Sequence, residues 1–285
     1  MKIAHLILAH SEPGQLERLI DRLWHEQSDF YIHLDLKSSL DAFRYLERDN
    51  RVFFVKNRVK VSWGTYSLVQ ATINSFEEIL ASAEYDFINL MSAQDYPLKS
   101  ADYIYDFLEQ NKGKAFMHCL SIETEWTEAQ IRLRKYDFGT FAFKGKYRLQ
   151  AIWNAVMPAR KMPDGLKPYG RSQWFTIPAE CVEYALKYLK DNSEIERFFR
   201  YTWAADELIF QTILYNSHYR DCIVNDNLRY IDWSERKTSP KTLTIADSRS
   251  LMNFDGLFAR KFNAKIDAEI LALIDSKILA GELKG

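Results

Sequence analysis

The sequence predicts an α/β fold with a mostly parallel sheet flanked by helices, and three observations lead to this class. Strand-like apolar runs alternate with helical patterns over the first 120 residues, as in consecutive strand-helix-strand units. The 285 residues are enough to bury a large hydrophobic core in one domain, without stabilising disulfides or metal ions. Regular patterns return at residue 174, after an irregular segment. The five strand runs predicted in the first part span residues 3–8, 30–34, 52–55, 87–90 and 115–118.

Helices are predicted between these strands. One has an apolar face at positions spaced three and four apart, namely Val69, Ile73, Phe76 and Leu80. Another begins near Ser100, a suitable N-cap residue, and stops at Gly113. These spacings indicate crossover helices that cover the sheet.

The second part of the chain is less regular. Residues 123–171 are basic and aromatic, which we interpret as an irregular, mobile insertion on the acceptor side. A strand is predicted at 174–177, followed by a helix from Pro178. Residues 193–196 fit a capping box that opens the next helix, and 266–278 fit an amphipathic closing helix packed on the sheet.

Composition narrows the class of partner and compartment. Lys and Arg number 38 against 39 for Asp and Glu, so the overall charge favours neither nucleic acid nor an anionic membrane as the main partner, while a local basic pocket stays open. Cys119, Cys181 and Cys222 are widely spaced, which argues against a disulfide framework or metal site and for a reducing cytoplasm. The first apolar run is too short for a transmembrane segment or a signal peptide.

Polar residues follow three predicted strands directly. They are His10, Asp35 and the segment 94–97. Ligands of parallel α/β sheets bind beyond the carboxyl ends of the strands, so these residues are candidates for a site. Each one alone is also explained as a turn former or helix cap. Their joint position at one sheet edge favours a binding site.

The phosphate-binding patterns of other nucleotide enzymes are missing. The ten glycines form neither a Walker loop nor a dinucleotide fingerprint. No convincing Asp-x-Asp pair is present to carry Mg²⁺ or Mn²⁺. If phosphates bind, side chains must hold them, and we expect no metal cofactor.

Seven segments together carry a resemblance to a known family. In order they are 31–38, 62–67, 90–98, 172–175, 205–207, 229–233 and 257–262. The chain resembles the core-2/I-branching β-1,6-N-acetylglucosaminyltransferases and peptide O-xylosyltransferases of glycosyltransferase family fourteen. The match covers nearly the whole chain. It implies a GT-A-like, Rossmann-like fold and an inverting transfer from a UDP-sugar donor without a metal.

The resemblance also implies roles for individual residues. Glu207 is the implied catalytic base, in a motif where Ala205 stands in place of the family's proline. The implied donor-binding residues are His10, Asp35 and Trp63 near the uridine, with Arg229 and Lys261 on the diphosphate. We add four weaker acceptor-binding candidates: Asp95, Arg134, Tyr136 and Trp174.

Each of these residues has an alternative structural explanation. The Asp-Glu pair that ends in Glu207 is also what a helix start favours. Arg229 could be an edge-strand charge, and Lys261 a solvated surface residue. Trp63 and Trp174 could be core residues.

The predicted protein is one domain over residues 1–285. Residues 1–120 form the nucleotide-binding half, and 121–285 supply the acceptor site, the base and the diphosphate site. The donor sugar stays open between N-acetylglucosamine and xylose, and the acceptor is a carbohydrate or glycan, with surface polysaccharide synthesis as one setting. We expect a cytoplasmic protein and leave open its peripheral attachment to the inner membrane face. The rival function is a non-catalytic carbohydrate-binding protein on a degenerate transferase fold. A nucleotidyltransferase is disfavoured by the missing metal carboxylates.

Overall fold

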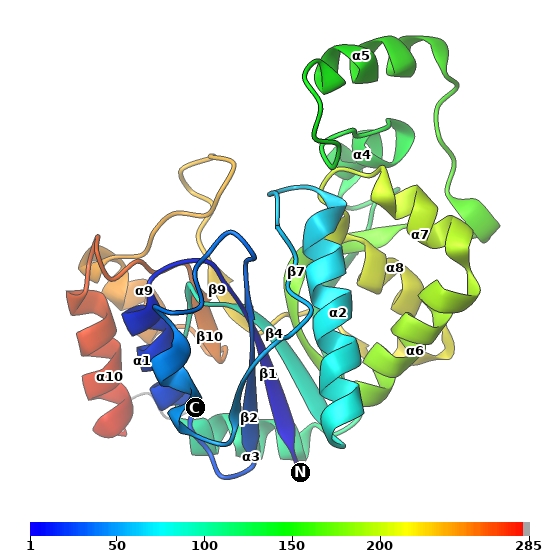
Figure 1. The fold of residues 1–285 in the computed structure, drawn as a ribbon. Coiled ribbons are helices and arrows are strands. Elements are labelled where there is room, and N and C mark those ends of the chain that lie inside the picture. The colour runs from blue at the N-terminus through cyan, green and yellow to red at the C-terminus, as the bar shows by residue number, and fades with distance from the viewer. Residues whose placement is uncertain (282–285) are drawn as a thin grey trace.

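A seven-stranded mixed sheet forms the centre of the computed structural model, which describes residues 1–281 apart from the side chain of Arg48 (Figure 1). The strand order is β3-β2-β1-β4-β7-β6-β8. β1 pairs in parallel with β2 and β4, whereas β7 runs antiparallel to β4 and β6. The strands are β1 Ile3–Ala9, β2 Ser28–Leu34, β3 Val52–Phe54, β4 Phe87–Ser92, β6 Ala115–Ser121, β7 Tyr169–Pro178 and β8 Ile223–Val224. The predicted α/β class is confirmed, and each predicted strand run coincides with a strand.

Helices cover both faces of this sheet, because alternate residues of β1 point to opposite sides. Ala4 and Leu6 belong to a core cluster with α2, α6 and α8, while Ile3 and Ile7 belong to a second cluster with α1, α3 and α10. The long helices are α1 Pro13–Leu23, α2 Tyr66–Ser82, α3 Ala101–Gln110, α5 Lys146–Val156, α6 Ala179–Asp191 and α10 Glu269–Leu279. The shorter ones are α4 Gln130–Arg134, α7 Ser193–Arg200, α8 Ile209–Tyr215 and α9 Ser248–Met252.

A second, three-stranded sheet lies next to the carboxyl end of β4. It has the order β5-β10-β9, with bounds β5 Asp95–Pro97, β9 Arg229–Ile231 and β10 Phe258–Arg260. β10 pairs antiparallel with β5 and parallel with β9. This sheet brings residues from three distant parts of the chain beside the first strands.

Two local predictions are confirmed and one is wrong. The Ser100 hydroxyl accepts a hydrogen bond from the Tyr103 N–H at 3.2 Å, so it caps α3 as predicted. Val69 and Phe76 are fully buried on α2. The capping box at 193–196 is wrong, because Asn192 precedes the helix and makes no side-chain cap. Its side-chain amide instead donates back to the Tyr188 carbonyl at the end of α6.

The segment predicted to be irregular contains an ordered helix. α5 lies at the outer end of a projection, beyond α4 (Figure 1). None of its residues is buried, so its apolar positions do not follow the pattern of a helix packed on a core. For this reason the sequence pattern did not identify it.

Candidate functional site

A cavity of about 730 Å³ opens at the carboxyl ends of β1, β2 and β4. Its volume falls in the range of small-molecule sites, and its place agrees with the rule for parallel α/β sheets. Residues from all parts of the fold line it, including Ala9, Ser92, Trp174, Glu207 and Lys261. We call it the strand-end cavity.

Strand β7 reaches this cavity because it runs antiparallel to β4. Phe175 pairs with Leu90, so the earlier residues of β7 extend past the carboxyl half of β4. Arg171, Ser172, Gln173 and Trp174 therefore line the strand-end cavity. At Gly170 of β7, an added Cβ would lie 2.3 Å from the Glu207 carbonyl oxygen. Glycine therefore allows the turn that contains Glu207 to pack against β7.

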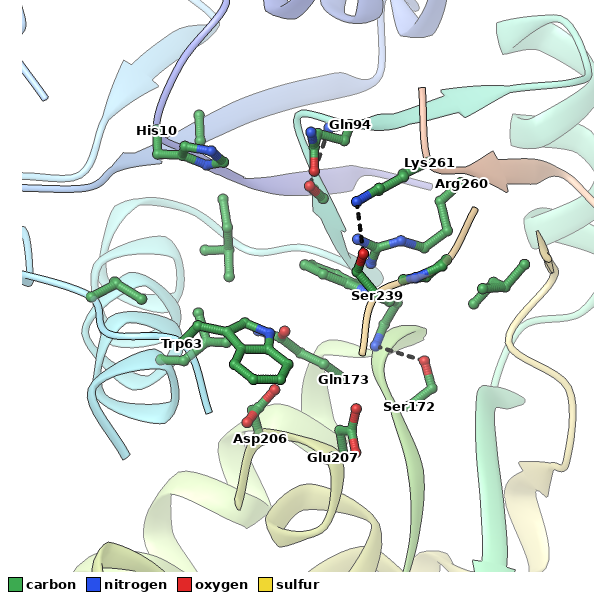
Figure 2. A pocket seen from close by; sticks show the side chains of 18 of the residues that line it. His10, Trp63, Gln94, Ser172, Gln173, Asp206, Glu207, Ser239, Arg260 and Lys261 are labelled. Carbon is green, nitrogen blue, oxygen red and sulfur yellow. Dashed lines mark hydrogen bonds between the residues drawn. The ribbon is translucent and has the colours of Figure 1, made fainter. Parts of the chain in front are cut away.

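One wall of the cavity is cationic (Figure 2). β10 ends in Arg260, and Lys261 follows it. Nε and Nη1 of Arg260 are buried without a hydrogen-bond partner among residues 1–281, although Nε lies 3.4 Å from Asp95 Oδ1. Lys261 Nζ donates to Ser239 Oγ at 3.2 Å, and burial, with help from the Arg260 charge, lowers the pKa of this lysine. Unused buried donors of this kind suit an anion.

Arg229 lies behind this wall and its side chain is completely buried. Its guanidinium donates to the Leu90 carbonyl at 3.1 Å and to Asn89 Oδ1, and Nε lies 3.8 Å from Asp95 Oδ2. Asp95 thus stands between Arg229 and Arg260. Arg229 borders the cavity, but most of its donors are already engaged. Arg229 does lie on the edge strand β9, but its side chain is buried in the protein and not exposed to solvent.

The opposite wall carries two carboxylates. Asp206 and Glu207 point into the cavity from the turn before α8 (Figure 2). Glu207 Oε2 accepts a hydrogen bond from Arg132 Nη1 at 2.6 Å. Arg132 is held in turn over the rings of Trp126 and Trp203, at 4.8 and 4.5 Å from their centroids. Burial, reinforced by the Glu207 charge, raises the pKa of Asp206 to about 7.

The three residues predicted near the uridine all line the same cavity. His10 is exposed at the end of β1, and Asp35 follows β2 with its carboxylate 3.3 Å from Lys37 Nζ. Trp63 is 66% exposed, so its explanation as a core residue is wrong. Its loop is fixed by Gly64, which has a φ of 72° and would place an added Cβ 2.7 Å from Trp203 Nε1.

The four acceptor candidates do not lie together. Trp174 lines the cavity with Arg260 stacked over its ring at 4.2 Å. Asp95 is buried between the two arginines behind the wall. Arg134 and Tyr136 are outside the lining of the strand-end cavity, and Tyr136 packs against Trp153 and Tyr201.

Sequence reasoning left out several residues that line or support the cavity. Arg260 lies beside Lys261 in the segment 257–262, and Arg132 lies in the basic segment 123–171, but neither was predicted as a site residue. Gln173 and Ser239 were also omitted, although Gln173 Nε2 is buried without a hydrogen-bond partner in the described chain. For Arg260 and Gln173 the signal is an unpaired buried donor, which only a structure displays. Arg132 and Ser239 are recognised by their hydrogen bonds to Glu207 and Lys261.

Two kinds of feature are absent from residues 1–281. No group of three or more His, Cys, Asp and Glu side chains there is placed to hold a metal ion. No helix in that range has the length and apolarity to cross a membrane.

The fold and the cavity define an α/β protein with a cavity of small-molecule size at the carboxyl ends of its parallel strands. The chain belongs to the Core-2/I-Branching enzyme family, whose sequence pattern matches residues 3–253. This confirms the family resemblance predicted from the seven segments.

Curated relatives are similar along almost the whole chain. A protein named Xylosyltransferase 2 from Canis lupus familiaris is 26% identical over 310 residues, which cover 96% of this chain and 33% of that protein. Xylosyltransferase 1 from Rattus norvegicus is 24% identical, with 97% and 35% covered. Xylosyltransferase 2 from Homo sapiens is 26% identical, with 96% and 33% covered. The chain therefore spans about a third of the length of these relatives.

Proposed function

We propose that this chain is a glycosyltransferase that moves a sugar from a UDP-sugar onto a hydroxyl of a carbohydrate or glycan acceptor, with inversion and without a metal. Membership of the Core-2/I-Branching enzyme family and similarity to proteins named xylosyltransferases support transfer of a sugar. UDP as the nucleotide, inversion and metal independence are parts of the proposal.

The observation that carries it is the pairing of two walls in one cavity. Glu207 faces the cavity on one side, and Arg260 and Lys261 face it on the other (Figure 2). A carboxylate can accept the proton of an acceptor hydroxyl, and cations can stabilise a departing diphosphate. The strand-end cavity has room for both partners.

The proposed reaction is a single displacement. The acceptor oxygen forms a bond to the anomeric carbon while its proton passes to the Glu207 carboxylate. The bond from that carbon to the β-phosphate oxygen breaks, and UDP leaves with the bonding electrons. Negative charge grows on the diphosphate, so fixed cations stabilise the transition state more than the ground state.

The cationic wall has the strength that this role needs. At ~4 Å and an effective dielectric of ~20, one positive charge contributes roughly 4 kcal/mol of attraction to an anion before desolvation is subtracted. Arg260 and Lys261 supply two such charges, and the proposal assigns them both to the diphosphate. Arg229 then holds Asp95 and the end of β4 in place, and its direct contact with phosphate stays a prediction.

The donor sugar, the residues that bind each substrate and the cellular location complete the proposal. N-acetylglucosamine and xylose both remain candidates for the donor sugar. His10, Asp35 and Trp63 are assigned to the nucleoside end, and Trp174 to the acceptor. The proposed location is the cytoplasm, with the enzyme next to an inner membrane face where glycans are assembled.

The test is release of UDP from a panel of UDP-sugars in buffer containing EDTA. Release from UDP-xylose or UDP-N-acetylglucosamine, slow without acceptor and faster with one, supports the proposal. Proton NMR of the product reports inversion as a β-linkage formed from the α-linked donor. Binding of the donors with no release of UDP under any condition would leave a carbohydrate-binding protein instead.

A further inference from the structure

Helix α5 is attached to the protein through its polar side. Gln150 Oε1 accepts a hydrogen bond from the Phe138 N–H at 2.7 Å. Asn154 accepts one from the Tyr136 N–H at 2.8 Å and donates one to the Tyr136 carbonyl at 2.9 Å. Gln150 and Asn154 are four residues apart and therefore share one face of the helix. This face packs on residues 136–138, and the Trp153 ring contacts the rings of Tyr136 and Phe138 there.

The apolar residues of α5 point the other way. Leu149 is 44% exposed, Ile152 62% and Val156 73%. These positions are three, four and seven residues apart, so they form one stripe along the helix. Phe143, just before the helix, is also exposed. A continuous apolar stripe in water is a feature of surfaces that bind something.

The charge around this stripe is strongly positive. Residues 140–168 contain six basic side chains and one acidic one. The whole chain has a net charge of −1, so the remaining residues together carry −6. Lys144, Arg148 and Lys161 are all exposed in this segment. The near-neutral total thus hides a local separation of charge.

We propose that α5 binds the surface of an anionic lipid bilayer, with Leu149, Ile152 and Val156 in the interface and the basic side chains on the headgroups. Apolar residues flanked by Lys and Arg are the combination that binds such a surface. A second copy of this chain is a poorer occupant, because pairing two α5 helices would bring two basic segments together. The inference does not depend on the proposed transfer reaction.

The position of α5 gives membrane binding a consequence for the cavity. The projection stands on the side of the sheet where the parallel strands have their carboxyl ends (Figure 1). α4, between α5 and the body, carries the Arg132 that contacts Glu207. Arg160 ties the returning segment to the body by donating to the Tyr201 carbonyl at 2.7 Å. A bilayer under α5 would therefore lie near the carboxylate wall, within reach of acceptors attached to lipid.

The test is sedimentation of the full chain with vesicles. We expect binding to vesicles of phosphatidylglycerol and phosphatidylcholine and little binding to phosphatidylcholine alone. The double variant Ile152→Asp, Val156→Asp should bind about 100-fold more weakly, because two aliphatic side chains no longer enter the interface. Ile266→Asp is the matched control, since Ile266 is 63% exposed outside this segment.

A second double variant and its control test the contribution of the basic side chains to vesicle binding. Lys144→Ala, Arg148→Ala should weaken binding to the anionic vesicles by about 30-fold and reduce its dependence on salt. Lys190→Ala on α6 is the control and should bind like the wild type. Wild-type protein that stays in the supernatant with anionic vesicles would overturn the proposal.

Two further measurements separate the alternatives. A dimer in analytical ultracentrifugation that Ile152→Asp dissociates would show that the stripe binds a second copy, which also overturns the proposal. UDP release from a soluble donor should be the same for the wild type and the Ile152→Asp, Val156→Asp variant. A failure of the proposed reaction would leave vesicle binding unchanged, so the two ideas fail independently.

Discussion

Replacing Glu207 by glutamine removes one proton acceptor and leaves the shape of the side chain. Arg132 loses a charged partner at 2.6 Å, but it stays held over the rings of Trp126 and Trp203. The cationic wall across the cavity is untouched. The variant should therefore fold and bind UDP as the wild type does.

The expected loss lies in the chemical step. General-base catalysis is typically worth ~10²- to 10⁴-fold, which corresponds to about 3 to 5 kcal/mol of activation free energy. We expect Glu207→Gln to lower kcat for transfer by at least ~100-fold. The dissociation constant for UDP should change by no more than about twofold, which is ~0.4 kcal/mol.

The assay measures transfer by UDP release and UDP affinity by calorimetry on the same preparation. Glu196→Gln is a matched control, because Glu196 is an ion-paired glutamate on α7 whose partner is Arg200. It should keep full activity. Near wild-type turnover by Glu207→Gln would remove this residue from the mechanism, and a parallel loss of UDP affinity would assign it to donor binding instead.

Three further changes probe the rest of the cavity. Lys261→Ala should lower kcat/KM by about 100-fold, since a charge-assisted hydrogen bond contributes ~1.5 to 3 kcal/mol; the exposed Lys265→Ala is its control, and equal activity of the two variants would contradict the assignment. Asp206→Asn should raise the free energy of unfolding near pH 8 but not near pH 4. Burial raises the pKa of Asp206 to about 7 from an ordinary 3.8, so its protonated form stabilises the fold below about pH 4 and this contribution is lost as the pH rises through 7. In urea unfolding, the free energy of unfolding of the variant should exceed that of the wild type by up to about 4 kcal/mol at the higher pH. A difference that does not vary with pH would refute the raised pKa of Asp206. Gly170→Ala should lower kcat while the circular dichroism stays native, because its Cβ would meet the Glu207 carbonyl oxygen; unchanged kcat would show that the turn adjusts.

The sequence predicted the parts of the fold that depend on local pattern. The continuous apolar run of β1 follows from burial on both faces of the sheet, and the spacing of Val69 and Phe76 follows from burial on one face of α2. The strands and crossover helices could therefore be assigned. Helix α5 could not be assigned, because the side-chain amides of Gln150 and Asn154 face the protein while its apolar residues face solvent. The prediction of a capping box at 193–196 was wrong because Asn192, the residue before α7, uses its side-chain amide to bind the Tyr188 carbonyl at the end of α6. That contact has no signal in the local sequence pattern.

The candidate site was predictable where residues follow strands. His10 and Asp35 could be placed at one sheet edge from chain direction alone. The different surroundings of Arg229 and Arg260 could not be predicted, because they depend on how β9 and β10 pair around Asp95. Register between distant segments has no local signal. The segments 229–233 and 257–262 therefore contain the two arginines without showing that one buried nitrogen of Arg229 and two of Arg260 lack a hydrogen-bond partner in the described chain.

Calorimetric titration of UDP in excess EDTA, and again with Mn²⁺, tests the central claim most directly. The claim is that Arg260 and Lys261 hold the diphosphate in place of a metal ion. We predict the same UDP affinity in both buffers for the wild type, and a loss in both for Arg260→Ala and Lys261→Ala. UDP binding that disappears in EDTA, returns with Mn²⁺ and is indifferent to the two substitutions would contradict the claim.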